Sequence, residues 1–168
     1  MHAKSIALTL SLISLLAGCA TPSIPPTQTT IDKSREYSAP YDKVWSAIIA
    51  GVAESNLNIT TLEKESGIVA ISNTTYDPSW ANEGTRGSIL GVPDQVIERI
   101  ANFNILATPQ GSEKTRVQVN SSFKMNVRHG NGSQAIPFTY QWQQAYSNGT
   151  LEEIILNGIE HRVQRRRE

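Results

Sequence analysis

Residues 115–127, TRVQVNSSFKMNV, alternate apolar and polar side chains more regularly than any other stretch of this 168-residue chain. Because successive side chains of a strand point to opposite faces of a sheet, this period of two predicts a β-strand. The face expected to be buried carries Val117, Val119, Ser121, Phe123, Met125 and Val127. Such a strand indicates an antiparallel sheet that is covered on one side and open to solvent on the other.

Shorter strands are predicted on the amino-terminal side of this stretch. Residues 36–39, 58–64, 67–74 and 101–107 are rich in β-branched and aromatic side chains or alternate in polarity. Glu65-Ser66-Gly67 is a predicted hairpin turn, because Gly67 can adopt a positive φ.

Two helices are predicted, one at each end of this set of strands. Pro40 suits the first turn of a helix over residues 41–56, whose apolar side chains recur at helical spacing. The second helix begins at Thr150, which with Glu153 fits a capping box. Its apolar stripe is Leu151, Ile155, Ile159 and Val163, supported by Ile154 and Leu156. Near the carboxyl end of this helix lie Arg162, Arg165, Arg166 and Arg167, whose positive charges interact favourably with the helix dipole. The alternative is that they contact anionic headgroups.

Three segments are harder to assign. Residues 75–95 and 129–137 are polar and rich in glycine and proline, and we expect both to be loops. Residues 96–100 fit either a short helix or the start of a strand. We expect Tyr140, Trp142 and Tyr146, which precede the last helix, to pack in the core.

This order of elements predicts an α+β fold, with an antiparallel sheet of about 4–5 strands and two helices packed on one face. The arrangement, closed by a long terminal helix, looks helix-grip-like. We expect residues 36–168 to form a single domain.

The first nineteen residues have the features of a targeting segment. Lys4 precedes an apolar run over residues 6–16, which is too short for a membrane-spanning helix. The stretch Leu16-Ala17-Gly18-Cys19 resembles the bacterial lipobox. The resemblance implies that residues 1–18 are a signal peptide cut between Gly18 and Cys19, and that Cys19 carries a diacylglyceryl group. Several acyl chains on one residue hold a protein to a membrane almost permanently.

The residues after the lipobox bear on where the domain sits. Ala20 follows the cysteine, and resemblance to sorted lipoproteins then implies the periplasmic face of the outer membrane. Residues 19–35 comprise the lipidated cysteine and a segment rich in proline and threonine, which predicts an extended, flexible tether.

Composition argues against several classes of function. Lys+Arg and Asp+Glu both number 15, and this balance argues against a nucleic-acid partner. Cys19 is the one cysteine, so Cys-based zinc sites and a catalytic thiol within the domain are excluded. We expect no metal, no cofactor and no catalytic residues, and we expect His129 to be a solvated loop residue.

The segment 75–95 holds the remaining candidates for a site. Asp77, Glu83, Asp94 and Glu98 are carboxylates that could form an acid–base pair, although nothing in their spacing fixes one. Tyr76, Trp80 and Arg86 make a possible interaction loop, because aromatic and arginine side chains are common interface anchors. The alternative is that Trp80 folds back against the sheet.

Two short motifs suggest a family. Tyr41-Asp42-Lys43-Val44-Trp45 and Asn148-Gly149-Thr150-Leu151-Glu152 resemble the starts of the two helices in BamC-like lipoprotein domains of the outer-membrane barrel-assembly machinery. The resemblance spans residues 36–165 and implies one helix-grip domain, whereas the BamC lipoprotein carries two.

Three functions follow as hypotheses. The first is a non-enzymatic adaptor or scaffold, anchored to the outer membrane and bound to other envelope proteins. The second is a module that binds a lipid or small amphiphile, which a cavity above about 300 Å³ would favour. The third is an envelope hydrolase that uses the loop carboxylates.

Overall fold

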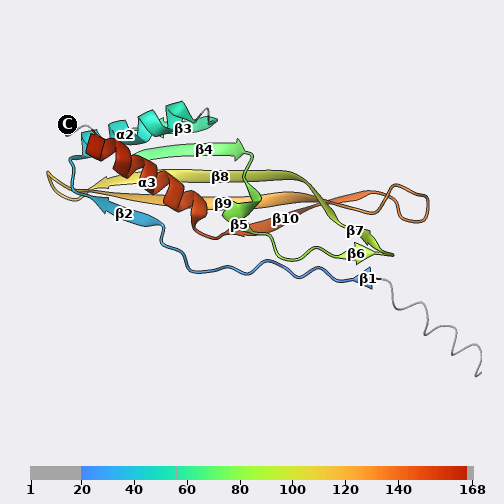
Figure 1. Cartoon of the computed structure of the whole chain (residues 1–168). Helices are drawn as coiled ribbons and strands as arrows, with labels where there is room; N and C mark the ends of the chain where they lie inside the picture. The colour runs from blue at the N-terminus through green and yellow to red at the C-terminus, as the bar shows by residue number, and fades with distance from the viewer. Residues whose placement is uncertain (1–19, 56, 166–168) are drawn as a thin grey trace, which may run out of the picture.

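In the computed structural model, the described part of the chain comprises residues 20–55 and 57–165. Two helices pack against a mainly antiparallel sheet of seven strands, in the order β3-β4-β8-β9-β10-β5 with β2 also paired to β9 (Figure 1). The α+β class is confirmed, and the sheet is wider than the predicted 4–5 strands.

Two long strands form the centre of this sheet. β8 (Gln95–Pro109) and β9 (Thr115–His129) pair along almost their whole length. The predicted strand over residues 115–127 is therefore confirmed, and so is the one over 101–107. Residues 96–100 belong to β8, and the register shifts between Val96 and Glu98. The second of the two predicted alternatives, the start of a strand, is therefore correct, and the bulge explains why the pattern alone did not decide between strand and helix.

The amino-terminal strands also follow the predicted order. The hairpin of β3 (Ile59–Glu63) and β4 (Ile68–Thr74) turns at Gly67, whose φ is +72°. β2 covers Ser34–Tyr37, so the observed strand lies two residues before the predicted one, over residues 36–39, at both ends. It pairs with the start of β9.

A strand missing from the sequence-based expectation follows the loop after β9. β10 (Thr139–Ser147) pairs with residues 123–129 of β9, on the same edge that β2 uses nearer the start of β9. Tyr140 and Trp142 face solvent, with exposed fractions of 59% and 45%. The prediction that they pack in the core is therefore wrong for these two residues. Tyr140 and Trp142 do alternate with glutamines as in a strand, but the aromatic side chains lie on the solvent-exposed face of the sheet.

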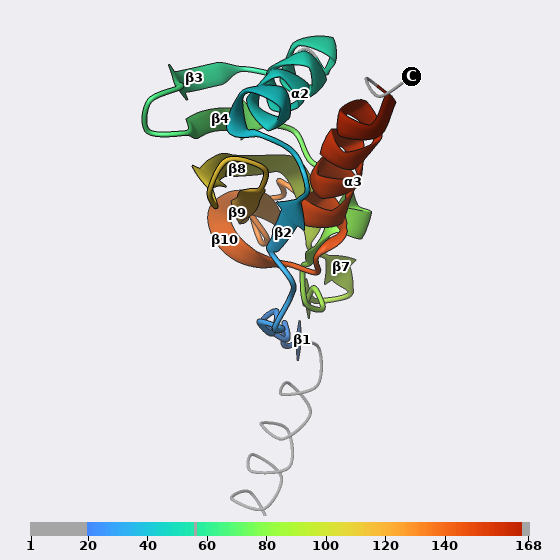
Figure 2. The same ribbon diagram turned by 90° about the vertical axis from the view of Figure 1, so that its left-hand side faces the viewer.

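The two helices lie side by side on one face of the sheet, as Figures 1 and 2 show. α2 covers Tyr41–Glu54 and α3 covers Thr150–Arg165, close to the predicted bounds. Their buried side chains join those of β8 and β9, including Phe103, Ile105 and Val119, in one apolar core. Among the described residues, no helix is long and apolar enough to cross a membrane.

The start of α3 differs from the predicted capping box. The Glu153 N–H donates to the Gly149 carbonyl, and the Thr150 N–H donates to Asn148 Oδ1 at 3.1 Å. Thr150 is the first helical residue, so the cap is supplied by Asn148 from the preceding turn.

The segment between β4 and β8 contains several short elements. They are the 3-10 helix η2 (Pro78–Trp80), β5 (Ala81–Asn82), which pairs with the end of β10, and the hairpin of β6 (Ser88–Ile89) and β7 (Val92–Pro93). The predicted loop is thus tied to the sheet at both ends.

The described part of the predicted tether runs alongside this hairpin (Figure 1). β1 (Ala20–Thr21) pairs with β6, and Ile24 and Thr85 exchange backbone hydrogen bonds of 2.8 and 2.9 Å. A Cβ at Gly87 would lie 2.6 Å from the Thr21 carbonyl oxygen. The missing side chain therefore permits this close approach, which composition alone did not predict.

Candidate functional site

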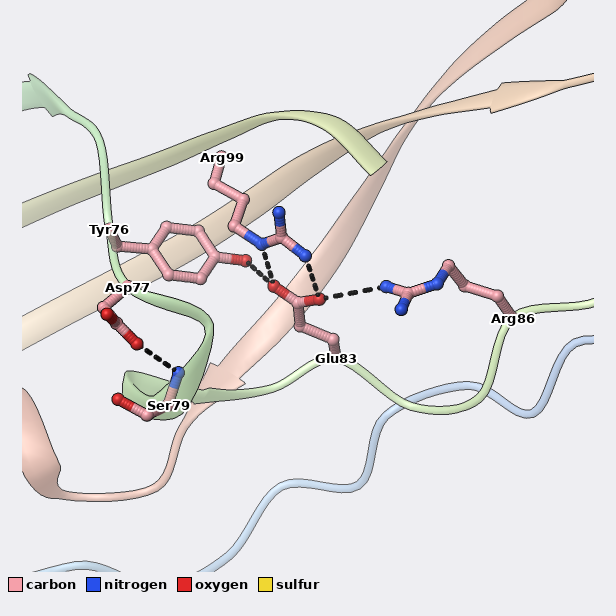
Figure 3. Close-up of polar contacts among 6 residues, drawn as sticks. All are labelled: Tyr76, Asp77, Ser79, Glu83, Arg86 and Arg99. Atoms are coloured by element: carbon pink, nitrogen blue, oxygen red, sulfur yellow. Dashed lines mark hydrogen bonds and ion pairs between the residues drawn. The ribbon is translucent and has the colours of Figure 1, made fainter. Parts of the chain in front are cut away.

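Glu83 forms the most connected polar cluster on the segment between β4 and β8 (Figure 3). Its Oε1 accepts hydrogen bonds from the Tyr76 hydroxyl at 3.0 Å and from Arg99 Nε at 2.6 Å. Its Oε2 accepts from Arg99 Nη2 at 2.9 Å and from Arg86 Nη1 at 3.3 Å. Arg99 lies on β8, so this fork-to-fork pair fixes the segment against the central sheet.

Electrostatics in this cluster favour the ionised carboxylate. Burial alone would raise the pKa of Glu83, but the hydrogen bonds from Arg99 and Tyr76 and the arginine charges outweigh it and lower the pKa. Burial raises the pKa of the Tyr76 hydroxyl, and the Glu83 charge raises it further. Glu83 therefore stays ionised at neutral pH and Tyr76 stays protonated, which suits a structural clamp.

A second contact joins the end of this segment to the sheet. His129 Nδ1 lies 2.7 Å from Asp94 Oδ1, and the Asp94 side chain is buried. His129 is the last residue of β9 and its side chain is largely covered. The expectation of a solvated loop histidine is therefore wrong, because His129 ends a long strand and its side chain lies against buried Asp94, the residue that follows β7.

The four candidate carboxylates occupy separate environments. Asp77 accepts a hydrogen bond from the Ser79 N–H at 2.8 Å, and the side chain and N–H of Ser79 together lower the pKa of Asp77. Glu83 pairs with Arg99 and Asp94 with His129, whereas Glu98 is exposed beside the β8 bulge. Within the described residues, each of the first three carboxylates contacts a different partner, and none of these contacts joins two carboxylates.

The three residues of the possible interaction loop are placed differently from one another. Tyr76 is 2% exposed, and its ring packs edge-on against Phe123 with centroids 4.9 Å apart. Trp80 is partly buried against the core, next to the start of α3, where the Asn148 N–H donates to its carbonyl. Arg86 remains about half exposed. Tyr76 and Trp80 thus both fold back against the sheet, as the alternative reading of the sequence predicted for Trp80.

Glu152 is a buried carboxylate that the sequence analysis missed. It lies in the first turn of α3 with an exposed fraction of 0%. It accepts hydrogen bonds from the Ser121 hydroxyl at 2.5 Å and from the Ser147 hydroxyl at 2.6 Å. The available signal was Ser121 itself, a polar residue on the apolar face of β9 that needs a buried partner.

The face of the sheet opposite the helices carries no described helix, as Figure 2 shows. A shallow groove of about 340 Å³ crosses β4, β8 and β9 on this side. Its polar lining comprises Ser72, Asn102, Asn104, Asn120 and Ser122. Asn120 Nδ2 donates to Asn104 Oδ1 at 3.1 Å, so a row of amide groups presents both donors and acceptors to a partner.

An apolar cavity lies between the two helices and the sheet. Its volume is about 260 Å³, and its lining includes Ile48, Val52, Phe103, Ile155 and Ile159. Ile154 also lines it and is exposed, in contrast to its predicted supporting place in the helix stripe. The volume falls below the value of about 300 Å³ expected of a site for a small amphiphile.

Two further expectations concern a metal site and the ends of the chain. In the part of the chain that the structure describes, no group of three His, Cys, Asp or Glu side chains could hold a metal ion. Gly18 and Cys19, the predicted signal peptide, and Arg166 and Arg167 lie outside the described residues. The lipidation site therefore stays a prediction from sequence.

The chain matches no known protein-family model and no curated protein sequence. Its resemblance to BamC-like domains therefore remains an expectation from two short motifs.

Proposed function

We propose that this protein is a lipid-anchored envelope lipoprotein that acts as a non-enzymatic adaptor, holding a partner protein at the periplasmic face of the outer membrane. The anchor half of the proposal rests on the lipobox at residues 16–19. On this proposal, the α+β domain is a helix-grip-like unit of the BamC-like kind.

The observation that carries the adaptor half is the uncovered sheet face. Its groove is lined by asparagine and serine side chains, which supply adaptable hydrogen bonds in protein recognition surfaces. Exposed Trp142 lies on the neighbouring strand β10, and exposed aromatic side chains are common binding anchors. A polar groove with an exposed tryptophan on the next strand suits a protein partner better than an apolar ligand.

The contacts of the carboxylates support a role without catalysis. Glu83 is neutralised by Arg99, which is a structural partner for its charge. A general acid or base needs a group within reach of a substrate proton. The small apolar cavity likewise supports the adaptor in preference to the amphiphile-binding module.

Crosslinking in intact cells tests the adaptor. A photoreactive amino acid placed at Asn104, in the groove, is expected to crosslink one reproducible envelope protein. The matched control places the same group at Glu65, on the exposed turn between β3 and β4. Recovery of this chain alone from both positions, or equal capture from both, would contradict the proposal.

A further inference from the structure

Leu90 occupies an unfavourable position at the tip of the β6–β7 hairpin. Leu90 and Gly91 have φ values of +50° and +77°, as a two-residue turn of the primed type requires. Asparagine or glycine is the usual residue there, because a larger side chain is disfavoured at positive φ. Leu90 is also 61% exposed, so the fold gains little burial from it. Backbone strain of this kind points to a role outside the fold itself.

Other exposed apolar side chains lie at the same end of the sheet as this hairpin. Ten large hydrophobic residues are exposed in the described part of the chain, and five of them form what we call the distal patch: Ile89, Leu90, Ile97, Phe138 and Tyr140. Two contacts hold the hairpin beside the end of β9, namely Asp94 with His129 and Gln95 with Arg128. Tyr140 pairs with Arg128 in the sheet, and the Arg128 guanidinium lies 4.7 Å from the Phe138 ring centroid.

The chain enters the described structure at this same place. Ala20 pairs with Ile89 and Thr21 with Ser88, so β1 is the outer strand of the small sheet that carries Leu90. Cys19 directly precedes Ala20, and consecutive Cα atoms are about 3.8 Å apart. Ala20, which follows the proposed lipid attachment site in the sequence, therefore lies beside Ile89 of the distal patch.

We propose that the distal patch rests in the headgroup region of the membrane that holds the lipid anchor. This inference rests on the proposed anchoring at Cys19. Leu90 and Ile89 enter the outer part of the acyl layer, and Tyr140 and Phe138 lie at the interface, where aromatic rings are favoured. Arg128 lies among anionic headgroups. The domain is then held in one orientation on the membrane and does not swing freely on its tether.

Depth-dependent quenching tests this orientation with the full chain, as its cells produce it, in vesicles of phosphatidylethanolamine and phosphatidylglycerol. Leu90→Cys and Leu62→Cys each receive an environment-sensitive fluorophore. Leu62 is the matched control, because it is an exposed leucine on β3, outside the distal patch. We expect blue-shifted emission at position 90, and quenching by lipids spin-labelled near the headgroup at least twice that at position 62. Equal quenching at the two positions would overturn the orientation.

Flotation with the vesicles and mass analysis separate this inference from the anchor. A chain that floats with lipid on Cys19, but keeps position 90 in water, overturns the distal patch and leaves the anchor intact. A chain without lipid overturns the anchor, and quenching at position 90 on added vesicles would then support the patch alone. Absence of quenching in that case overturns both proposals.

A second variant tests the patch without a label. Leu90→Asn suits the turn, so it is expected to raise the midpoint of thermal unfolding in solution while weakening the orientation on vesicles. A lower midpoint in solution would show that Leu90 serves the fold, and would contradict the inference.

Discussion

Ser121 occupies a position in β9 that the alternating pattern reserves for an apolar side chain. Its neighbours on that face, Val119 and Phe123, are almost fully buried. The Ser121 hydroxyl instead donates to the buried Glu152 carboxylate at 2.5 Å. This bond joins β9 to the start of α3, and a polar group buried there depends on such partners.

Ser121→Ala is expected to destabilise the domain even though alanine fits the apolar face. The change leaves one Glu152 oxygen without its donor, at a cost of about 1–3 kcal/mol in the free energy of unfolding. Urea denaturation measures this free energy. Ser122→Ala is the control, since Ser122 lies on the open face and its change should cost less than about 0.5 kcal/mol. Similar losses in both variants would contradict the role of the Ser121–Glu152 bond.

The Glu83 cluster predicts a dependence of stability on pH. The pKa of Glu83 is lower in the folded state than its ordinary value of 4.5, so its stabilisation is complete above that value. It is lost as the pH falls through the folded pKa. We expect Glu83→Gln to lower the free energy of unfolding by about 1–3 kcal/mol near neutral pH.

In urea titrations, the gap between the wild type and Glu83→Gln should shrink as the pH falls from about 7 to about 3. Glu98→Gln, at an exposed carboxylate of β8, is the matched control and should show a small gap throughout. A gap for Glu83→Gln that does not change with pH would contradict the role of its ionised form.

At the scale of elements, the clearest predictions from the sequence were the strands and helices whose apolar side faces the core. β9 and α2 are of this kind, because burial of one face produces a clear period. β10 was missed because Tyr140 and Trp142 lie on its exposed side, so its pattern is inverted. The first part of β8 was ambiguous because its bulge breaks the period. The short strands β1, β5, β6 and β7 have two residues each, which is too few to show an alternating pattern.

The pairing of β1 with β6 depends on the small size of Gly87. Gly87→Ala would place a Cβ 2.6 Å from the Thr21 carbonyl oxygen, and β1 must then move. The backbones of Ile24 and Thr85 are joined by two hydrogen bonds. We expect amide hydrogen exchange at both residues to become about tenfold faster.

Gly51→Ala is the control for this change, because its Cβ would make ordinary contacts from 3.6 Å. It should leave exchange at Ile24 unchanged. Unaltered protection at Ile24 in Gly87→Ala would show that the amino-terminal segment does not need the close approach.

At the scale of the whole molecule, the domain has two unlike faces and one distinctive end. Helices and the 75–94 segment cover one face of the sheet, a groove of amide and hydroxyl groups marks the other, and the distal patch lies where the chain enters. The sequence predicted the class of fold, but not the groove or the patch. Both are made by residues that come together from distant strands.

The central claim is that this domain works while held at a membrane through Cys19, and the mass of the mature protein tests it most directly. The account predicts that protein extracted from membranes begins at Cys19 and carries the mass of a diacylglyceryl group with a further acyl chain. Cys19→Ala should accumulate as a precursor or as a species without lipid. A mature protein that lacks lipid, or a Cys19→Ala variant that still enters the detergent phase as mature protein, would contradict the account.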